Sequence, residues 1–585
     1  MRRESAERLE VRDQSWALGI FLALAALYWH GHCRTFGAGD SPQHVLSALT
    51  LGVSRPPGYP LYVFIAHLFS RLPLGSPAGL VNAFSGLLQA GASAIFYLIL
   101  RRWRCGRMAA LAGTLMLSLA PLYWYYAEVA EVRALNDILA FLAAFLALSG
   151  PPALFGIILG LGVSHHPTYI FIFPAIAYLL WERKYKPRDC AVAALCAATA
   201  CAAPYLTLYL RLCWGRAPVY NPDGVRTLTD TINLFLRKNT GGVTSFASGV
   251  PGLALQSFEP ARALRESGWF GGLALHDLML PGLALAALGC WNLWKTRREA
   301  LIFWALWVLG TLLPVVLLSS QEVRFGDLDY LRAIVLRYYL LPTAGLFALA
   351  AFGADWLLSR SRKEFGWALV VVMIPGPVLY RPVDLSRSDP VRSYVEDILR
   401  SSGPRDMILL DSDEANFSML YMDLVEGKTE DRVFLATPLF GNAAFVERLA
   451  RRHPDLKLPR EGSGLSRSLK RWMTLNPDRP MEAEPTMRDT LVQISSACFP
   501  QGILIRVGPR FPPLSESAAQ ARAFLDDSSA EKIPSWGLRP WTQEVYLLKA
   551  YAMSLEFYGS FVRRAGDDAL AKRVRRAFDA VTSVR

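Results

Sequence analysis

Asp40 lies in a stretch of sequence, residues 36–86, whose side chains could do chemistry at the edge of a membrane. The acid closely follows an apolar segment and directly precedes Ser41-Pro42. A carboxylate in a site of low dielectric can act as a general base or as an electrostatic anchor. An Asp shortly before Pro is also typical of a helix start, where its carboxylate caps the first N–H groups. On position alone the cap is favoured, and the two roles can coexist.

The sequence Arg55-Pro56-Pro57-Gly58-Tyr59-Pro60 divides this stretch into two amphipathic halves. Proline fixes φ, and glycine permits turns that strain other residues. We interpret the motif as a rigid elbow between two interfacial helices, at which Arg55 could face a phosphate.

Two pairs of polar residues stand at other boundaries between apolar segments. Glu128 and Glu131 are three residues apart, which predicts that both lie on one helical face as a carboxylate pair. Glu131 could instead pair with Arg133 or face solvent. His165 and His166 could bind a phosphate or a sugar hydroxyl, although histidines at an interface are more often simply hydrogen-bonded polar ends.

Arg324 and Arg337 flank the start of a late apolar segment, on the side opposite the basic connections described below. Because arginine is disfavoured on that side of a membrane, these two residues need a local reason. Binding an anionic lipid phosphate is one such reason, and snorkelling toward headgroups is the other. The sequence favours neither.

The composition indicates a polytopic membrane protein. The chain has 585 residues, 52% of them hydrophobic, with the apolar residues concentrated in the first two thirds. The net charge of +13 would suggest nucleic acid in a soluble protein, but here much of the Lys and Arg falls between apolar segments. We therefore expect no nucleic-acid partner. The 8 cysteines form no CxxC pair and no zinc-ligand spacing, so we expect no disulfide framework.

We expect about eleven transmembrane helices. If residues 1–15 are cytoplasmic, alternate connections should be basic. All of these connections are basic except the tight uncharged turn at 149–152. The first outer loop, 32–78, and all the polar residues above then lie on the extracytoplasmic side. The apolar segments are 16–31, 79–100, 108–126, 134–149, 153–164, 167–181, 190–212, 273–294, 300–319, 336–358 and 367–380.

Residues 381–585 should form a soluble extracytoplasmic domain, because they are rich in charge and contain no long apolar run. Apolar runs at 407–410 and 432–436 predict buried strands in an α/β part over about 390–510. The stretch 541–583 predicts a pair of amphipathic helices. The transmembrane part would then span residues 16–380.

Several of these motifs, in this order, resemble those of the protein O-mannosyltransferase-like integral membrane proteins of the GT-C superfamily. The most specific is Pro56-Pro57-Gly58-Tyr59-Pro60. The others are 39–41, Val81-Asn82 with Ser85, 127–136, 164–168 and 337–342. The order fits over about residues 16–380, and the tail fits loosely.

This resemblance implies a GT-C-like fold and a membrane glycosyltransferase. Such enzymes move a sugar from a polyprenyl phosphate to an extracytoplasmic acceptor with inversion; here the sugar would be mannose or a similar hexose and the acceptor a protein Ser/Thr or a glycan. Asp40 would be the catalytic base. The donor phosphate would be bound by Arg337, Arg55, Arg324, His165 and His166. The sugar or acceptor would be bound by Gln43, Tyr59, Glu128, Glu131 and Asn82.

Two positions depart from the family pattern. Gln43 stands where the family usually has Glu, and Arg55 stands where it usually has His. Gln43 cannot take a proton, which leaves Asp40 as the acid of that motif. The resemblance implies no cofactor, because arginines would neutralise the phosphate; metal dependence stays open.

Two other functions fit the same sequence. The protein could be a transporter or flippase for a lipid-linked sugar, although apolar segments with few charges argue against it. It could also be a membrane scaffold of the same fold without activity, which Gln43 favours. The compact connections favour a bacterial inner membrane as its location.

Overall fold

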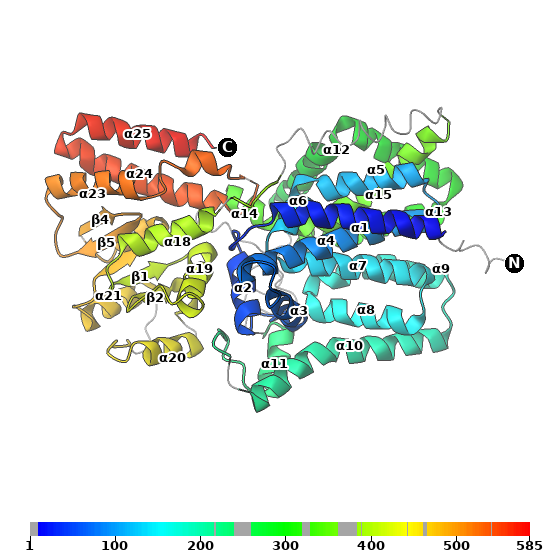
Figure 1. The fold of residues 1–585 in the computed structure, drawn as a ribbon, viewed down its shortest axis with the longest axis horizontal. Helices are drawn as coiled ribbons and strands as arrows, with labels where there is room; N and C mark the ends of the chain where they lie inside the picture. Colours follow the sequence, from blue (N-terminus) through cyan, green and yellow to red (C-terminus); the bar gives the residue numbers. More distant parts are fainter. Residues whose placement is uncertain are drawn as a thin grey trace.

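The computed structural model describes residues 10–215, 218–238, 259–318, 328–360, 383–387, 389–440, 443–459, 465–495, 497–539 and 541–584. A helical bundle, built from the chain before residue 360, adjoins a smaller domain built from the chain after 383 (Figure 1). The two share one cluster of buried apolar residues, which extends from α1 to the C-terminal helices.

The bundle consists of long apolar helices joined by short connections. Among the described residues, six helices are long and apolar enough to cross a membrane, or seven if the bent pair α5–α6 counts as one span. The chain is therefore a polytopic helical membrane protein. The bundle elements are α1 (Val11–Gly31), α4 (Pro77–Arg102), α5 (Arg107–Leu119), α6 (Pro121–Glu128), α7 (Val132–Ser149), α8 (Pro152–His165), η1 (Pro167–Ile172), α9 (Phe173–Glu182), α10 (Pro187–Trp214), α11 (Leu228–Phe235), α12 (Pro260–Thr296), α13 (Arg298–Leu318), α14 (Leu328–Leu336), η4 (Arg337–Tyr339) and α15 (Leu340–Leu358).

The predicted apolar segments coincide with helices wherever the structure describes them. Those at 153–164 and 167–181 fall on α8 and on η1 with α9, which are short apolar helices. The segment at 367–380 lies outside the described residues. The count of eleven spans therefore stays a prediction.

The basic connections gather at one end of the bundle. Arg101 and Arg107 both bind the carboxylate of Asp13, in the first turn of α1, at 3.0 and 2.9 Å. Arg297 donates to the carbonyl of Trp103 at 2.7 Å. Because these residues come from connections far apart in the sequence, the alternation of basic loops predicted above corresponds to one face of the molecule.

The first outer loop forms two short helices at the opposite end of the bundle, α2 (Ser41–Thr50) and α3 (Pro60–Ser70). The elbow between them contains Gly58 at φ 85° and Tyr59 at φ 47°, both in the left-handed region. A Cβ on Gly58 would lie 2.6 Å from the Leu234 side chain, so this tight turn requires glycine. The elbow predicted from the prolines is thus present.

The smaller domain contains a five-stranded mixed sheet of order β2-β1-β3-β5-β4. Parallel β1 (Met407–Leu410) and β2 (Val433–Ala436) fall on the two predicted apolar runs. The rest of the sheet is β3 (Met481–Ala483), β4 (Ala497–Gln501) and β5 (Leu504–Gly508). The helical elements are α18 (Pro390–Ser401), α19 (Asp413–Leu424), η5 (Thr437–Leu439), α20 (Ala443–Arg452), α21 (Leu465–Leu475), η6 (Pro485–Met487), α22 (Arg488–Val492), α23 (Leu514–Asp527), η7 (Ile533–Trp536), α24 (Val545–Ala565) and α25 (Asp568–Thr582).

Strand β1 is buried on both faces, and its residues belong to two separate apolar clusters. Ile408 and Leu410 belong to the large cluster shared with α18, α24 and the bundle. Met407 and Leu409 belong to a second cluster with α20 and α21. Successive strand residues point to opposite faces, so helices cover the sheet on both sides (Figure 1).

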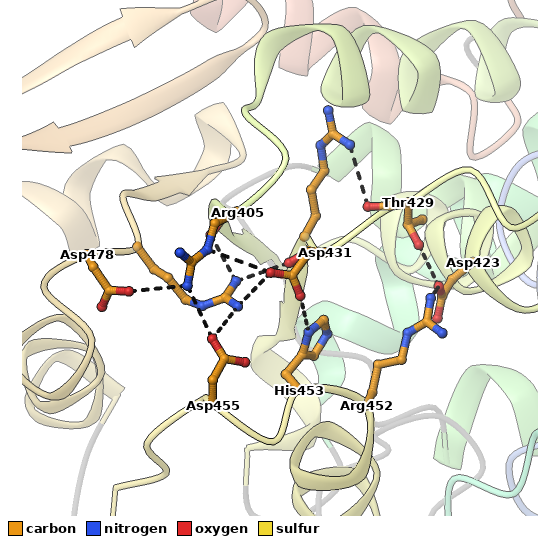
Figure 2. A network of polar contacts seen from close by, with 10 residues as sticks. Arg405, Asp423, Thr429, Asp431, Arg452, His453, Asp455 and Asp478 are labelled. Carbon is orange, nitrogen blue, oxygen red and sulfur yellow. Dashed lines mark hydrogen bonds and ion pairs between the residues drawn. The ribbon is translucent and has the colours of Figure 1, made fainter.

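An ion-pair network ties the loops at one edge of this sheet (Figure 2). Arg479, whose side chain is 1% exposed, donates to Asp431 and Asp455 at 2.9 Å each. Figure 2 shows Arg405 directed at Asp455 and Asp478, with distances of 3.2 and 3.3 Å. The network fixes the connections that lead into β2 and β3, and it lies apart from the site described next.

Candidate active site

An ion pair between Asp40 and Arg337 is the centre of the polar cluster. Arg337 Nη1 lies 2.5 Å from Asp40 Oδ2, although the two residues are 297 positions apart. Asp40 stands at the start of α2 in α-helical geometry, and its side chain makes no capping hydrogen bond. The carboxylate is therefore engaged by the arginine rather than by the helix, and the Asp40 side chain remains 27% exposed.

The charge of Asp40 is fixed by its cationic neighbours. Burial by itself raises the pKa of the carboxyl group, but Arg337, with His44 and Arg55, outweighs it and lowers the pKa to about 2. Asp40 is thus ionised at neutral pH. While it is paired with Arg337 it is a weak base.

Glu131 is the second acid of the cluster. Its carboxylate lies 3.9 Å from Arg337 Nη1 and is 5% exposed. The predicted placement of Glu128 and Glu131 on one helical face is wrong, because the helix breaks between α6 and α7. The reason is that two backbone N–H groups of the break bond side chains of α4 instead of helical carbonyls: Ala130 donates to Asn82 at 2.6 Å and Glu131 to Ser85 at 3.2 Å.

Asn82 links separate segments of the protein backbone by hydrogen bonds. Besides accepting from Ala130, its amide donates to the carbonyls of Cys33 and Thr35, at 2.8 Å each. The residue is fully buried. Asn82 thus joins the end of α1, helix α4 and the break before α7, and so positions Glu131.

Glu128 lies apart from the ion pair. Its carboxylate accepts a hydrogen bond from Trp124 Nε1 at 2.6 Å. A Cβ on Gly31 would lie 2.1 Å from that carboxylate, so Glu128 packs against the end of α1. Sequence spacing alone could not separate the two glutamates.

His44 is a member of the cluster that the sequence reasoning missed. Ligand atoms of Asp40, His44 and Glu131 all lie within 4.8 Å of one another, so this trio could hold a metal ion. His44 is 2% exposed. The sequence feature that could have identified His44 is its i,i+4 spacing from Asp40 at the start of α2. This spacing places both residues on one helical face.

An aromatic group extends from His44 to the two predicted histidines. The Tyr59 ring stacks on His166 and lies edge-on to His165, with centroids 5.9 Å apart in both cases. His165 Nε2 pairs with the carbonyl of Val132 at 2.8 Å, and His166 accepts from the Thr168 backbone at 3.1 Å. Both histidines therefore have structural bonds as well as a place beside Tyr59.

Gln43 and Arg55 contact other residues, away from the ion pair. Gln43 donates to the Tyr220 hydroxyl at 3.2 Å. Arg55 pairs with Asp413 of α19 at 3.0 Å and stacks over Phe417 at 4.5 Å. Arg324 lies outside the described residues.

Arg133 is a second residue that the sequence reasoning missed, having been considered only as a partner of Glu131. Arg133 and Arg337 both line the same small cleft. Both guanidinium groups lie over the Tyr338 ring, at 4.1 and 5.6 Å from its centroid. Arg133 also donates to Thr168 at 3.2 Å. Two buried arginines beside one cleft form a site suited to a phosphate group.

Glu414 of α19 reaches the same region from the smaller domain. It accepts from the backbone of Gly39, next to Asp40, at 3.2 Å, and from the Tyr330 hydroxyl at 3.3 Å. Burial, together with the charge of Asp413, raises the pKa of Glu414 to about 8. The acid lies in the first turn of α19, far along the chain from Asp40, so only the fold could reveal its proximity.

Fold and site together define a polytopic helical membrane protein with a polar, arginine-rich site at the end of its bundle. Residues 40–189 match the family model of the "Protein O-mannosyl-transferase TMEM260 N-terminal domain". The chain is 22% identical over 469 residues to "Protein O-mannosyl-transferase TMEM260" of Mus musculus, covering 76% of this chain and 65% of the relative. It is 23% identical over 394 residues to the protein of that name from Dictyostelium discoideum, covering 60% and 46%.

These matches confirm that the chain resembles the protein O-mannosyltransferase-like membrane proteins. The chain spans 65% and 46% of the length of these two relatives. Among solved structures it is similar to ArnT from Cupriavidus metallidurans, with a TM-score of 0.47 and 12% identity, covering 86% of this chain and 100% of that one. It is also similar to the oligosaccharyltransferase AglB from Archaeoglobus fulgidus, with a TM-score of 0.45 and 11% identity, covering 82% and 70%.

Proposed function

We propose that this protein is a membrane glycosyltransferase of GT-C type. It transfers mannose or a similar hexose from a polyprenyl-phosphate donor to a hydroxyl group, on Ser or Thr of a protein or on a glycan, with inversion. The observation that carries the proposal is the convergence of Asp40, Glu131 and Arg337 beside a cleft that Arg133 also lines. The names of the two relatives support the reaction class.

Asp40 takes the proton of the acceptor hydroxyl. As the acceptor oxygen bonds the anomeric carbon, the bond from that carbon to the phosphate oxygen breaks and polyprenyl phosphate leaves. A carboxylate with a pKa of about 2 is too weak a base for efficient proton transfer. The proposal therefore requires Arg337 to turn from Asp40 toward the donor phosphate, which restores the basicity of the carboxylate.

Arg337 and Arg133 hold the leaving phosphate. A guanidinium binds phosphate through two parallel N–H donors, and the two arginines outnumber the one acid, Asp137, among the residues that line the cleft. His165 and His166 support this phosphate site through Tyr59. Tyr59, Gln43 and Glu131 face the sugar or the acceptor. Arg55 belongs to the rim of the site.

The site and the smaller domain face the extracytoplasmic side. Support comes from the basic connections, which gather at the opposite end of the bundle with the N-terminal turn of α1. We place residues 1–15 in the cytoplasm, the transmembrane domain at 16–380 and the soluble domain at 381–585, in a bacterial inner membrane. The smaller domain presents the acceptor, and no organic cofactor is needed.

The test is transfer by the purified chain from a polyprenyl-phosphate hexose to a peptide rich in Ser and Thr. Asp40→Asn should lower the rate by about 10² or more, the usual contribution of a general base, while donor binding persists. Asp355→Asn, which removes a carboxylate charge but keeps an oxygen that accepts from Gly106 N–H at the opposite end of the bundle, is the matched control and should keep both transfer and donor binding. Full activity in Asp40→Asn would refute the role. Lipid translocation without product would favour a flippase, and neither activity would favour a scaffold.

A further inference from the structure

We propose that Asp40, His44 and Glu131 form a binding site for one divalent metal ion of the Mn²⁺ or Zn²⁺ type. The role of the ion, to hold the donor phosphate beside Arg337 while the carboxylate oxygen of Asp40 that is not bound to the ion takes the proton, rests on the proposed function. Its binding does not, and can be measured without any transfer reaction.

The geometry brings three ligand atoms together from two parts of the chain. Asp40 and His44 stand one turn apart at the start of α2, and Glu131 directly precedes α7. Their ligand atoms lie within 4.8 Å of one another. Ligands lie about 2 Å from such an ion, so small side-chain rotations bring all three onto it. Two carboxylates and one imidazole suit Mn²⁺ and Zn²⁺.

The ring nitrogens of His44 are the independent observation that points to a ligand. The residue is 2% exposed, and neither nitrogen has a hydrogen-bond partner among the described residues. The ring is held edge-on between Tyr59 and Tyr62, with centroids 5.6 Å away in both cases. A buried polar group without a partner is rare in native proteins and needs an explanation. A metal ion bound by His44 provides it.

Arg337 is the cation with which a metal ion would compete for the two carboxylates. Its guanidinium lies 2.5 Å from Asp40 and 3.9 Å from Glu131, so it neutralises the same two carboxylates that would bind the ion. An ion of charge +2 would displace it. The other face of Arg337 already lines the cleft with Arg133, which gives the displaced guanidinium a place at the phosphate.

The experiment is a metal titration of the full chain, purified in detergent and stripped with a chelator. Binding of Mn²⁺ is followed by electron paramagnetic resonance and bound Zn²⁺ by elemental analysis. We expect one ion per chain. His44→Gln and Glu131→Gln should each weaken binding by at least about 10-fold, since even loss of an outer-shell partner can do so. Arg337→Gln should tighten it by removing the competing cation.

His67→Gln is the matched control. This histidine lies in α3, pairs with the Ala48 carbonyl at 2.7 Å and lies outside the cluster, so the variant should bind metal like the wild type. Thermal unfolding of the stripped variants checks that each is folded. Absence of binding by the wild type, or equal binding by folded His44→Gln, would overturn the site. If the metal-stripped wild type transfers sugar at an undiminished rate, the ion has no role in transfer. The proposed glycosyltransferase function would not be affected by that result.

Discussion

At the scale of single residues, the arginines decide how the site handles charge. Arg337 is 12% exposed and satisfied by Asp40, whereas Arg133 bonds only a hydroxyl, of Thr168, among the described residues. A buried cation whose hydrogen-bonding partner is neutral is well placed to receive an anion. Arg133 should therefore contribute to donor binding, because the Thr168 hydroxyl to which it donates is neutral.

Replacing Arg133 tests this reading. Arg133→Gln should weaken binding of a polyprenyl phosphate by about 10- to 100-fold, because a hydrogen bond to a charged group contributes about 1.5–3 kcal/mol. Binding of the labelled lipid to the detergent-solubilised protein measures the effect. Arg183→Gln, which removes a bond to the Ala147 carbonyl at the other end of the bundle, is the control. Equal affinities for all three proteins would show that Arg133 is structural.

Glu414 predicts a pH dependence of stability. Its pKa is raised from 4.5 to about 8 in the folded protein, so the folded state holds a proton that the unfolded state has lost. Stability should fall as the pH rises from about 4.5 to 8, and the loss should level off above 8. In Glu414→Gln, which keeps an acceptor for Gly39, the unfolding temperature should fall less over this range. The same pH dependence in the variant and the wild type would contradict the assignment.

At the scale of elements, the break between α6 and α7 places Glu131 in the site. Asn82 holds this break through three hydrogen bonds to backbone groups. A helix continuing through residues 129–131 would instead leave Glu131 one turn from Glu128. The site thus depends on a side chain of α4 that touches none of the charged groups.

Asn82→Ala should lower the unfolding temperature and reduce transfer together. Each buried backbone group left without a partner costs about 1–3 kcal/mol. Asn221→Ala is the control: that amide also bonds backbone groups, but only those of Val225 in its own half-buried loop, so it should cost less. Differential scanning fluorimetry compares the two variants. If Asn82→Ala keeps both the wild-type unfolding temperature and activity, the break is held by other contacts.

Sequence patterns predicted the elements better than the contacts between them. The Pro-Pro-Gly elbow, the apolar helices and strands β1 and β2 are all encoded by neighbours in the sequence. The break before α7 was not predicted, because the groups that satisfy its N–H donors lie on α4. His44 had a readable spacing, but Arg133 and Glu414 join the site only through long-range packing.

At the scale of the whole molecule, the smaller domain covers the end of the bundle where the candidate active site lies. Helix α19 contributes Glu414 beside Gly39 and Asp413 beside Arg55. Aromatic pairs extend the contact, with Phe36 against Tyr421 at 5.1 Å and Tyr125 against Trp541 at 5.7 Å. In Figure 1, α19 lies directly beside α2. In the proposed reaction, this contact would let the domain bring an acceptor to Asp40.

A double-mutant cycle on Arg55 and Asp413 measures the polar part of this docking. Both side chains are partly exposed, at 30% and 22%, so the coupling energy should be about 1 kcal/mol or less. Unfolding temperatures of Arg55→Ala, Asp413→Ala and the double variant give the value. Coupling should shrink at high salt, as expected for a screened pair. Coupling that is strong and independent of salt would mean that the pair is buried in the working protein.

The most direct measurement of the central claim is mass spectrometry of envelope proteins from native cells that carry the intact gene, no gene, or the Asp40→Asn variant. Hexose on Ser or Thr of specific proteins should be present with the intact gene and absent in both other strains. The Asp355→Asn strain, as control, should keep the modification. Hexose at the same positions in the Asp40→Asn strain would contradict the account.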